Sequence, residues 1–114
     1  MKYLTTVLLI LAFSTTLQAE DAASVYSPKQ GIICDKKSNF CVDASGISMA
    51  STKINLGQKS VDEFMKMTDN FKDMDTTIFT FSNGLNCDTN NKICKKSKWD
   101  DKADAHWTKI LFGK

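Results

Sequence analysis

Two stretches decide the fold: GIICDKKSNFC at residues 31–41 and GLNCDTNNKIC at residues 84–94. Both read glycine, an aliphatic residue, any residue, cysteine, aspartate, four polar residues, an apolar residue and cysteine. Every shared position is offset by 53 residues. The chain therefore contains an internal repeat organised around its four cysteines.

Each copy of the repeat has the pattern of a β-hairpin, because a short apolar segment, a polar loop and a second apolar segment follow one another. Asn90 and Asn91 tolerate the positive φ angles that such a turn needs. In a symmetric hairpin the two cysteines of a copy lie opposite each other at a distance that suits a disulfide. We therefore predict disulfides within each copy, and these join the pairs Cys34–Cys41 and Cys87–Cys94.

Pairing between the copies is the alternative. A bridge from Cys34 to Cys87 would close a loop of about 54 residues and contribute about 4 kcal/mol, against about 2.5 kcal/mol for each local bridge. Loop entropy alone thus favours the long loops. Hairpin geometry favours the local pairs, because it brings their sulfur atoms together before the copies dock.

A further strand is expected before each hairpin. Val25-Tyr26-Ser27-Pro28 precedes the first copy, and Phe79-Thr80-Phe81-Ser82-Asn83 precedes the second. The Asn83-Gly84 pair indicates a tight turn that joins a strand at 76–81 to a strand at 85–87. Each repeat is therefore predicted to be a three-stranded meander.

Helices are expected to follow each meander, so that the repeating unit is strands and then a helix, twice. One begins with a capping box from Ser60 to Glu63, and its apolar face is formed by Val61, Phe64, Met65, Thr68 and Phe71. A shorter helix over 48–56 ends at Gly57. The third is capped by Asp100 or Asp101, has Ala103, Trp107, Ile110 and Leu111 on one face, and ends before Gly113. The predicted fold class is α+β, a single small domain of two disulfide-pinned β-meanders with helices packed beside them.

The first residues have the composition of a secretory signal peptide. Lys2 provides the positive charge, residues 4–17 are apolar or small and uncharged, and Ala19 precedes the acidic pair Glu20 and Asp21. An uncleaved membrane anchor is the alternative, but the apolar run falls short of the roughly 18 to 20 residues that a spanning helix needs. We predict cleavage of residues 1–19 after Ala19, and a periplasmic or secreted domain at 20–114 with no transmembrane segment.

The charge pattern argues against a nucleic-acid partner. All 15 basic residues are lysines, and the predicted mature domain holds 14 of them against 13 acidic residues. Nucleic-acid binders usually carry a basic stripe and use the bidentate arginine fork. The cluster of Lys92, Lys95, Lys96 and Lys98 is followed at once by Asp100 and Asp101, which indicates a solvated loop.

The residues that could carry chemistry favour structural roles. Six residues separate the cysteines of each pair, whereas structural zinc sites usually leave two to four, so we predict disulfides and no metal or cofactor. His106 is the only histidine and has no identifiable catalytic partner. Asp35 and Asp88 are explained by turn formation better than by a paired-carboxylate site. We therefore expect no enzymatic activity.

A surface remains the expected functional feature. Trp99 and Trp107 flank the charge-dense stretch 95–104, and aromatic residues with a charged rim are typical of an interaction patch. The alternative makes Trp107 the core anchor of the last helix. Met49, Met65, Met67 and Met74 are expected to be core filler more than a binding surface.

Several of these stretches resemble a known family. They are SPKQGIICD at 27–35, FCVDASGIS at 40–48, Leu56-Gly57, FTFSNGLNCD at 79–88 and LFG at 111–113. The chain resembles the YcgJ-like or Fels prophage protein-like family of small exported bacterial proteins over nearly all of its mature region. The resemblance implies a signal peptide and a periplasmic or secreted location, and it carries over no catalytic residues.

These observations lead to a binding or interaction protein of the cell envelope, whose partner is an envelope protein or a glycan. An inhibitor of a cell-wall hydrolase of the lysozyme type is the second hypothesis. The near-neutral charge weakens it, because an acidic face would aid capture of a basic enzyme. A small periplasmic enzyme is the third, and it would require His106 to lie in a concave pocket beside a perturbed carboxylate.

Overall fold

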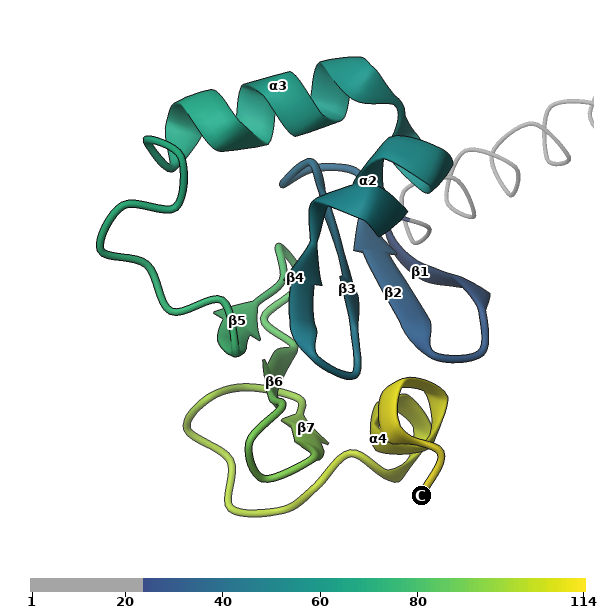
Figure 1. Cartoon of the computed structure of the whole chain (residues 1–114). Coiled ribbons are helices and arrows are strands. Elements are labelled where there is room, and N and C mark those ends of the chain that lie inside the picture. Colours follow the sequence, from purple (N-terminus) through teal and green to yellow (C-terminus); the bar gives the residue numbers. More distant parts are fainter. Residues whose placement is uncertain (1–23) are drawn as a thin grey trace, which may run out of the picture.

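The computed structural model describes residues 24–114, and in this range it contains two antiparallel sheets accompanied by three helices (Figure 1). Sheet A has the order β1-β2-β3-β4 and is formed by Val25–Lys29, Ile32–Asp35, Phe40–Asp43 and Gly46–Ser48. Sheet B has the order β5-β6-β7 and is formed by Ile78–Thr80, Asn86–Asp88 and Ile93–Lys95. The helices are α2 (Met49–Leu56), α3 (Gln58–Met67) and α4 (Ala105–Phe112). The α+β prediction is confirmed, although the first meander has four strands and not three.

The sequence repeat is also a structural repeat, because the two copies have the same backbone pairing. Val25 pairs with Asp35 as Ile78 pairs with Asp88, with the same offset of 53 residues. The two cysteines of each hairpin are direct partners with Cα atoms 4.0 Å apart, and the disulfides join Cys34 to Cys41 and Cys87 to Cys94 as predicted. Sheet pairing thus places each disulfide across the middle of its hairpin.

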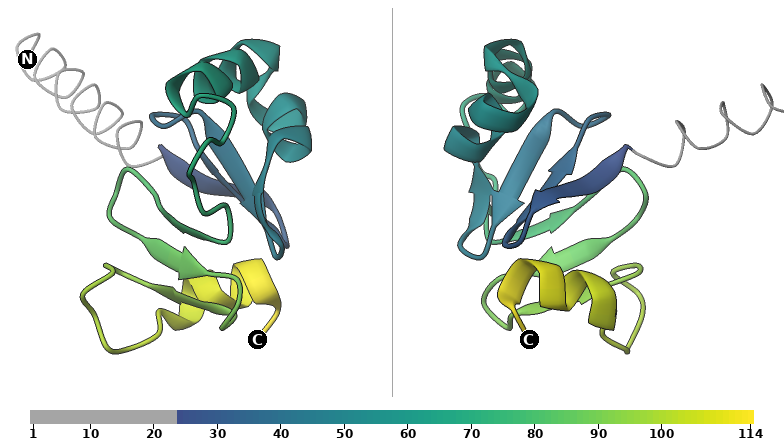
Figure 2. Two further views of the ribbon diagram at one scale, coloured as in Figure 1. Left: turned by 60° about the vertical axis from the view of Figure 1, so that its left-hand side comes forward. Right: turned by 90° about the vertical axis from the view of Figure 1, so that its right-hand side faces the viewer.

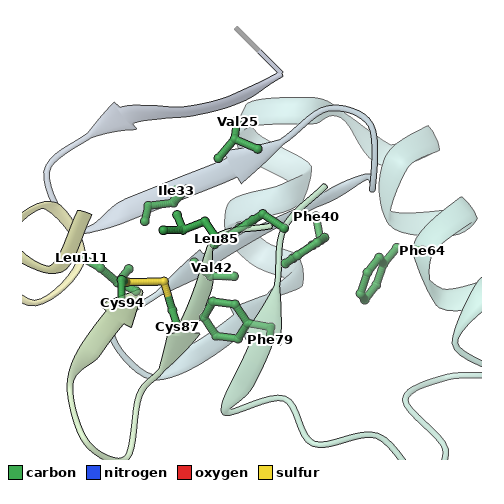
Figure 3. Close-up of a cluster of buried hydrophobic side chains, with 11 residues drawn as sticks. Val25, Ile33, Phe40, Val42, Phe64, Phe79, Leu85, Cys87, Cys94 and Leu111 are labelled. Carbon is green, nitrogen blue, oxygen red and sulfur yellow. A yellow bond between two sulfur atoms is a disulfide. The ribbon is translucent and has the colours of Figure 1, made fainter. Parts of the chain in front are cut away.

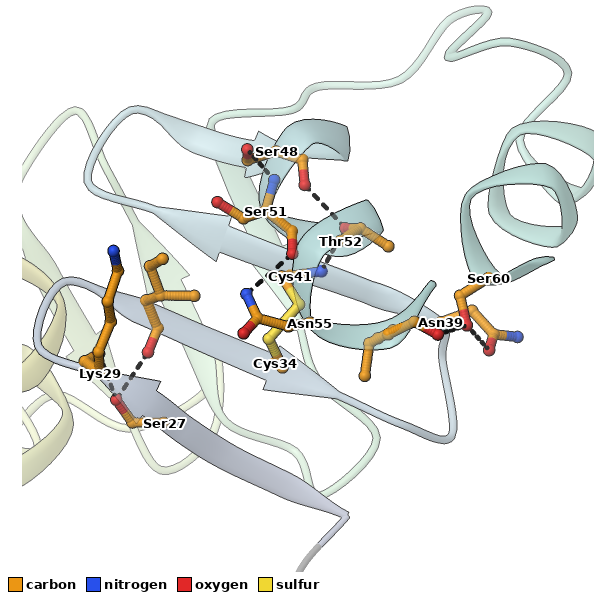
Figure 4. Close-up of a disulfide and its surroundings, with 12 residues drawn as sticks. Ser27, Lys29, Cys34, Asn39, Cys41, Ser48, Ser51, Thr52, Asn55 and Ser60 are labelled. Carbon is orange, nitrogen blue, oxygen red and sulfur yellow. Dashed lines mark hydrogen bonds between the residues drawn. A yellow bond between two sulfur atoms is a disulfide. The ribbon is translucent and has the colours of Figure 1, made fainter. Parts of the chain in front are cut away.

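The structural repeat also includes a helix after each meander, as predicted, together with a matching pair of contacts that the sequence pattern did not reveal. Ser48 caps α2 and Asp104 caps α4 through their side chains. Four residues into each helix a threonine hydroxyl accepts the backbone N–H of the second cysteine: Thr52 from Cys41 at 2.8 Å (Figure 4) and Thr108 from Cys94 at 2.9 Å. We call residues 24–56 the first unit and residues 77–112 the second unit.

Two helix starts differ from the prediction. The capping box at Ser60 is wrong, because α3 begins at Gln58 after Gly57 without a side-chain cap. The Ser60 hydroxyl and the Glu63 carboxylate instead contact the side chain of Asn39 in the β2–β3 turn, at 3.2 Å and 3.0 Å. That contact holds α3 against sheet A.

The cap of α4 is Asp104 and not Asp100 or Asp101, so Ala103 precedes the helix and is exposed. The rest of this prediction is confirmed, since Trp107, Ile110 and Leu111 contact the core and Gly113 ends the helix in the left-handed region.

One turn prediction and one predicted helix residue also need correction. The positive φ angle of the second hairpin falls on Lys92, at 55°, and not on Asn90 or Asn91. Asn39 has the corresponding position in the first hairpin, with φ at 61°. Phe71 lies beyond the end of α3 and is itself left-handed.

The core lies between the two sheets. Alternate residues of sheet A, among them Ile33, Phe40 and Val42, face the buried Phe79 and the Cys87–Cys94 disulfide of sheet B (Figure 3). The opposite face of sheet A, with the Cys34–Cys41 disulfide, is covered by α2 (Figures 1 and 4). Helix α4 packs beside β7 and adds Leu111 to the core, as Figures 2 and 3 show.

The predicted signal peptide and its cleavage site after Ala19 lie outside the described residues. Within residues 24–114, no helix has both the length and the apolar character that crossing a membrane requires.

Candidate functional site: the open face of sheet B

Asp35 is the point at which the second unit docks on the first. Its carboxylate is fully buried, and Oδ1 accepts the backbone N–H groups of Lys37 and Ser38 at 3.1 Å and 3.3 Å. Ser82 of the second unit donates its hydroxyl to Oδ1 at 2.9 Å and its backbone N–H to Oδ2 at 2.6 Å. The predicted turn role of Asp35 is therefore confirmed, while its contact with the other unit was missed.

An aromatic contact lies beside this carboxylate. Phe40 is the direct cross-strand partner of Asp35, and the ring of Phe81 stacks on the ring of Phe40 with centroids 5.2 Å apart. Phe81 and Ser82 are consecutive residues of the second unit. Together they contact Phe40 and Asp35, which are cross-strand partners in the first unit. Stacking and charge-assisted hydrogen bonds act together here.

The equivalent face of the second unit has no such occupant among the described residues of the chain. On β5, β6 and β7 the buried Phe79, Cys87 and Cys94 alternate with residues that point away from the core. We call this second set the open face of sheet B; it consists of Ile78, Thr80, Asn86, Asp88, Ile93 and Lys95. The offset of 53 residues makes Ile78, Asp88 and Ile93 the counterparts of Val25, Asp35 and Phe40.

Asp88 repeats the turn of Asp35 and then differs from it. Its Oδ1 accepts the backbone N–H groups of Asn90 and Asn91 at 2.9 Å and 3.2 Å. Its Oδ2, which corresponds to the oxygen that binds the Ser82 backbone in Asp35, accepts the side-chain amide of Asn91 at 2.7 Å. Asp88 is thus half-buried at the surface where Asp35 is fully buried.

Two hollows flank the open face and share Ile78 and Asn86. The larger has a volume of about 630 Å³, and its walls are apolar, with Phe40, Phe64, Phe79, Met67 and Met74. Its rim carries Asp73, Asp75 and Lys98. The smaller, of about 270 Å³, is lined by Asp88, Ile93, Lys95, Asn91 and Asp101 as well. The open face therefore lies between the two hollows and forms part of the wall of each, the larger being apolar and the smaller polar.

Exposed apolar side chains gather at the larger hollow. Met67 is 70% exposed and Ile78 is 42% exposed, and both line it. Trp99, at 81% exposure, follows Lys98 on the rim, and the Lys98 ammonium lies 4.7 Å from the centre of the Trp99 ring. Such a concentration of exposed apolar surface with a polar rim is typical of interaction sites.

The rim of the larger hollow carries a fixed negative charge. The hydroxyl of Thr77 donates a hydrogen bond to Asp75 and lowers the pKa of this carboxyl below its usual value, and the backbone N–H of Thr77 acts in the same direction. Asp75 is therefore ionised at neutral pH.

The two tryptophans of the predicted patch have different surroundings. Trp107 is half-buried and packs against the core, which supports its alternative role as the anchor of α4. Trp99 is exposed beside the larger hollow, and it remains a candidate contact residue. His106 is exposed on α4, where its ring packs edge-to-face on Trp107 at 5.2 Å, and it lines neither hollow.

The methionines also divide. Met49 and Met74 pack against the core as expected, whereas Met67 is exposed at the larger hollow. All four cysteines form disulfides. Across residues 24–114 no three histidine, cysteine or acidic side chains lie close enough to hold a metal ion.

Fold and site define a small α+β protein in which each of two related units is pinned by a disulfide. The sequence comparisons agree with this class, because the family described as "YcgJ protein" matches residues 25–112. The chain belongs to the YcgJ family.

A relative of this chain is the "Uncharacterized protein YcgJ" of Escherichia coli (strain K12). It is 30% identical over 109 residues, which cover 90% of this chain and 84% of the relative. No solved structure matches the chain.

Proposed function

We propose that this protein is an exported binding protein of the cell envelope, and that it holds an envelope protein or glycan on the open face of sheet B and in the adjoining larger hollow. The observation that carries the proposal is the position of exposed Met67 and Ile78 at one hollow of about 630 Å³. Its apolar walls and charged rim match the composition of a binding site. Export is supported by the two disulfides, which persist in oxidising compartments.

Binding without catalysis is the other half of this proposal. Three of the polar groups at the hollows are engaged in structure: Asp75 accepts from Thr77, Asp88 accepts from the turn at Asn90 and Asn91, and Asn86 donates to Thr80 at 2.9 Å. His106 lies on α4 and does not line either hollow. A nucleophile, a base and an orienting group would have to meet at one place for hydrolysis or group transfer.

Affinity capture from a periplasmic extract tests the proposal. We expect Ile78→Asp to lose the captured component, because it places a charge on the floor of the site. Ile54→Asp is the matched control, since Ile54 is 83% exposed on α2, and His106→Ala should also retain capture. Loss of capture with His106→Ala in a folded protein would overturn the proposed site and favour the enzyme hypothesis. Equal capture by Ile78→Asp and Ile54→Asp would exclude the open face.

A lysozyme-type hydrolase is the second candidate partner. Asp73 and Asp75 stand against Lys98 on the rim of the larger hollow, so the rim is locally acidic and suits a basic protein. Lysis of a peptidoglycan suspension by a lysozyme, with and without the mature protein, tests it. Unchanged lysis at excess protein would exclude this partner. Inhibition that Ile78→Asp abolishes and Ile54→Asp retains would identify it.

A further inference from the structure

The fold shows what one copy of the repeat binds, because the second unit sits on the core face of the first. Phe81 stacks on Phe40, and Ser82 gives both its hydroxyl and its backbone N–H to Asp35. Phe40 and Asp35 are cross-strand partners, so one strand pair presents an apolar platform and a carboxylate side by side. A consecutive aromatic residue and serine fill both positions.

The same pair of positions recurs on the open face. Asp88 is the cross-strand partner of Ile93, and Ile78 pairs with Asp88 from the other side, as Val25 pairs with Asp35 in the first unit. An apolar platform next to a carboxylate is therefore present twice. One copy is filled from within the chain, and the other lies at the smaller hollow.

We propose that the open face of sheet B binds a short peptide segment of another protein in which an aromatic residue is followed directly by serine or threonine. The aromatic ring packs on Ile93 and Ile78, and the hydroxyl and backbone N–H of the next residue donate to Asp88. This inference rests on the proposed function and names the class of its partner.

The surroundings of Asp88 are compatible with this occupant. The Asn91 amide at Oδ2 is an exposed side-chain donor, so a peptide N–H can take its place while both backbone N–H groups of the turn remain bound to Oδ1. Apolar residues on either side of the aromatic-serine pair reach the larger hollow, because Ile78 and Asn86 line both hollows. Pockets for side chains and a fixed acceptor for the main chain are typical of peptide recognition.

The probe is a synthetic peptide with the sequence of residues 80–84, TFSNG, in which Phe81-Ser82 is the single aromatic-serine pair, and a lysine at each end for solubility. Titrated at millimolar concentration into the mature, oxidised protein, it should shift the NMR amide signals of Ile78, Asp88 and Ile93. The same peptide with alanine in place of its serine should bind at least about tenfold more weakly, because one hydrogen bond to a charged acceptor is lost. Asp88→Asn should weaken both peptides, because both keep the backbone N–H that Asp88 accepts, and it should weaken the serine peptide more.

Ile93→Lys should abolish the shifts, whereas the matched control Ile54→Lys should retain them. If Ile93→Lys does not fold, the serine and alanine peptides still decide the question on the unaltered protein. Equal binding of both peptides, shifts confined to other surfaces, or no shifts at all would overturn the inference. Shifts of the open face by a chitooligosaccharide but not by the peptide would replace the peptide with a glycan.

Failure of this inference can be told from failure of the proposed function. If the peptide does not bind but Ile78→Asp still loses capture from the extract, the open face is a binding site and the partner is of another class. If Ile78→Asp and Ile54→Asp capture equally, the open face itself is excluded.

Discussion

Asp35 and Asp88 show how one residue type at one repeat position acquires two environments. Their roles in the turns follow from the sequence, because an aspartate at the start of a polar loop accepts nearby backbone N–H groups. The burial of Asp35 does not follow, since its donor Ser82 lies 47 residues away and meets it only through packing. The sequence therefore predicted the turn hydrogen bonds of both aspartates and missed the contact between Asp35 and Ser82.

Asp35→Asn should destabilise the protein far more than Asp88→Asn. The amide of asparagine would place a donor opposite the hydroxyl or backbone N–H of Ser82, on a side chain that is fully buried. We expect a loss of about 3 kcal/mol for Asp35→Asn and about 1 kcal/mol or less for Asp88→Asn. Urea unfolding with both disulfides intact measures the difference. Equal losses would mean that the Ser82 contact contributes nothing to the stability of the fold.

The two threonines that bind the cysteine backbones give a second comparison. Thr52→Val keeps the shape of the side chain and removes the acceptor of the Cys41 N–H, so a buried donor is left unpaired. We expect a cost of about 1 to 3 kcal/mol. Thr108→Val should cost less, because its bond to Cys94 is only partly buried. Thermal unfolding of both variants tests this order, and a neutral Thr52→Val would contradict it.

Asp75 provides a test by pH. Its pKa is lowered in the folded protein by Thr77, so its contribution to stability is present at neutral pH and is lost as pH falls through the folded pKa, below the ordinary value of 3.8. Thr77→Val removes the hydroxyl and should raise the pKa of Asp75 toward that value. An NMR titration of the Asp75 carboxyl measures it. An unchanged pKa would show that the hydroxyl is not the main cause.

Among the helices, the predicted ends are correct where no tertiary contact engages the capping residues. Helix α2 is ended by Gly57, as the sequence predicts, and its Ser48 cap was not predicted. Helix α3 contradicts its capping box because Ser60 and Glu63 contact Asn39 of a neighbouring turn. Helix α4 begins at Ala105 after its cap Asp104, and its Thr108 hydroxyl accepts the backbone N–H of Cys94. A polar side chain that could cap a helix can instead bind a neighbouring segment, and the capping pattern then fails to predict the start of the helix.

The joint between the sheets depends on a glycine. A Cβ on Gly46 would overlap the carbonyl oxygen of Thr76, which accepts the backbone N–H of Ile47 at 2.9 Å, and the φ of Gly46 is +129°. Gly46→Ala should therefore cost about 3 kcal/mol or more. The matched control is Gly113→Ala, where φ is +77° and the space is open, with a cost of about 1 kcal/mol. Similar denaturation midpoints for the two variants would contradict this account of the joint.

At the scale of the molecule, the sequence predicted the α+β class, the repeat and the local disulfides, because each depends on spacing within a short segment. It did not predict how the units dock. The disulfide face of the second unit packs on the Phe40 face of the first, so the equivalent face of the second unit stays open. Two units with the same pairing pattern can stack in several ways, and the choice depends on side-chain packing that no local pattern contains.

The most direct measurement is site-specific photocrosslinking in bacterial cells that export the protein. A benzophenone amino acid is placed in turn at Ile78 on the open face and at Ile54 on α2, two exposed isoleucines in different regions of the molecule. Our account predicts a discrete crosslinked product from position 78, reduced by a second substitution Met67→Asp in the larger hollow, and none from position 54. Crosslinking from position 54 with none from position 78 would contradict the account.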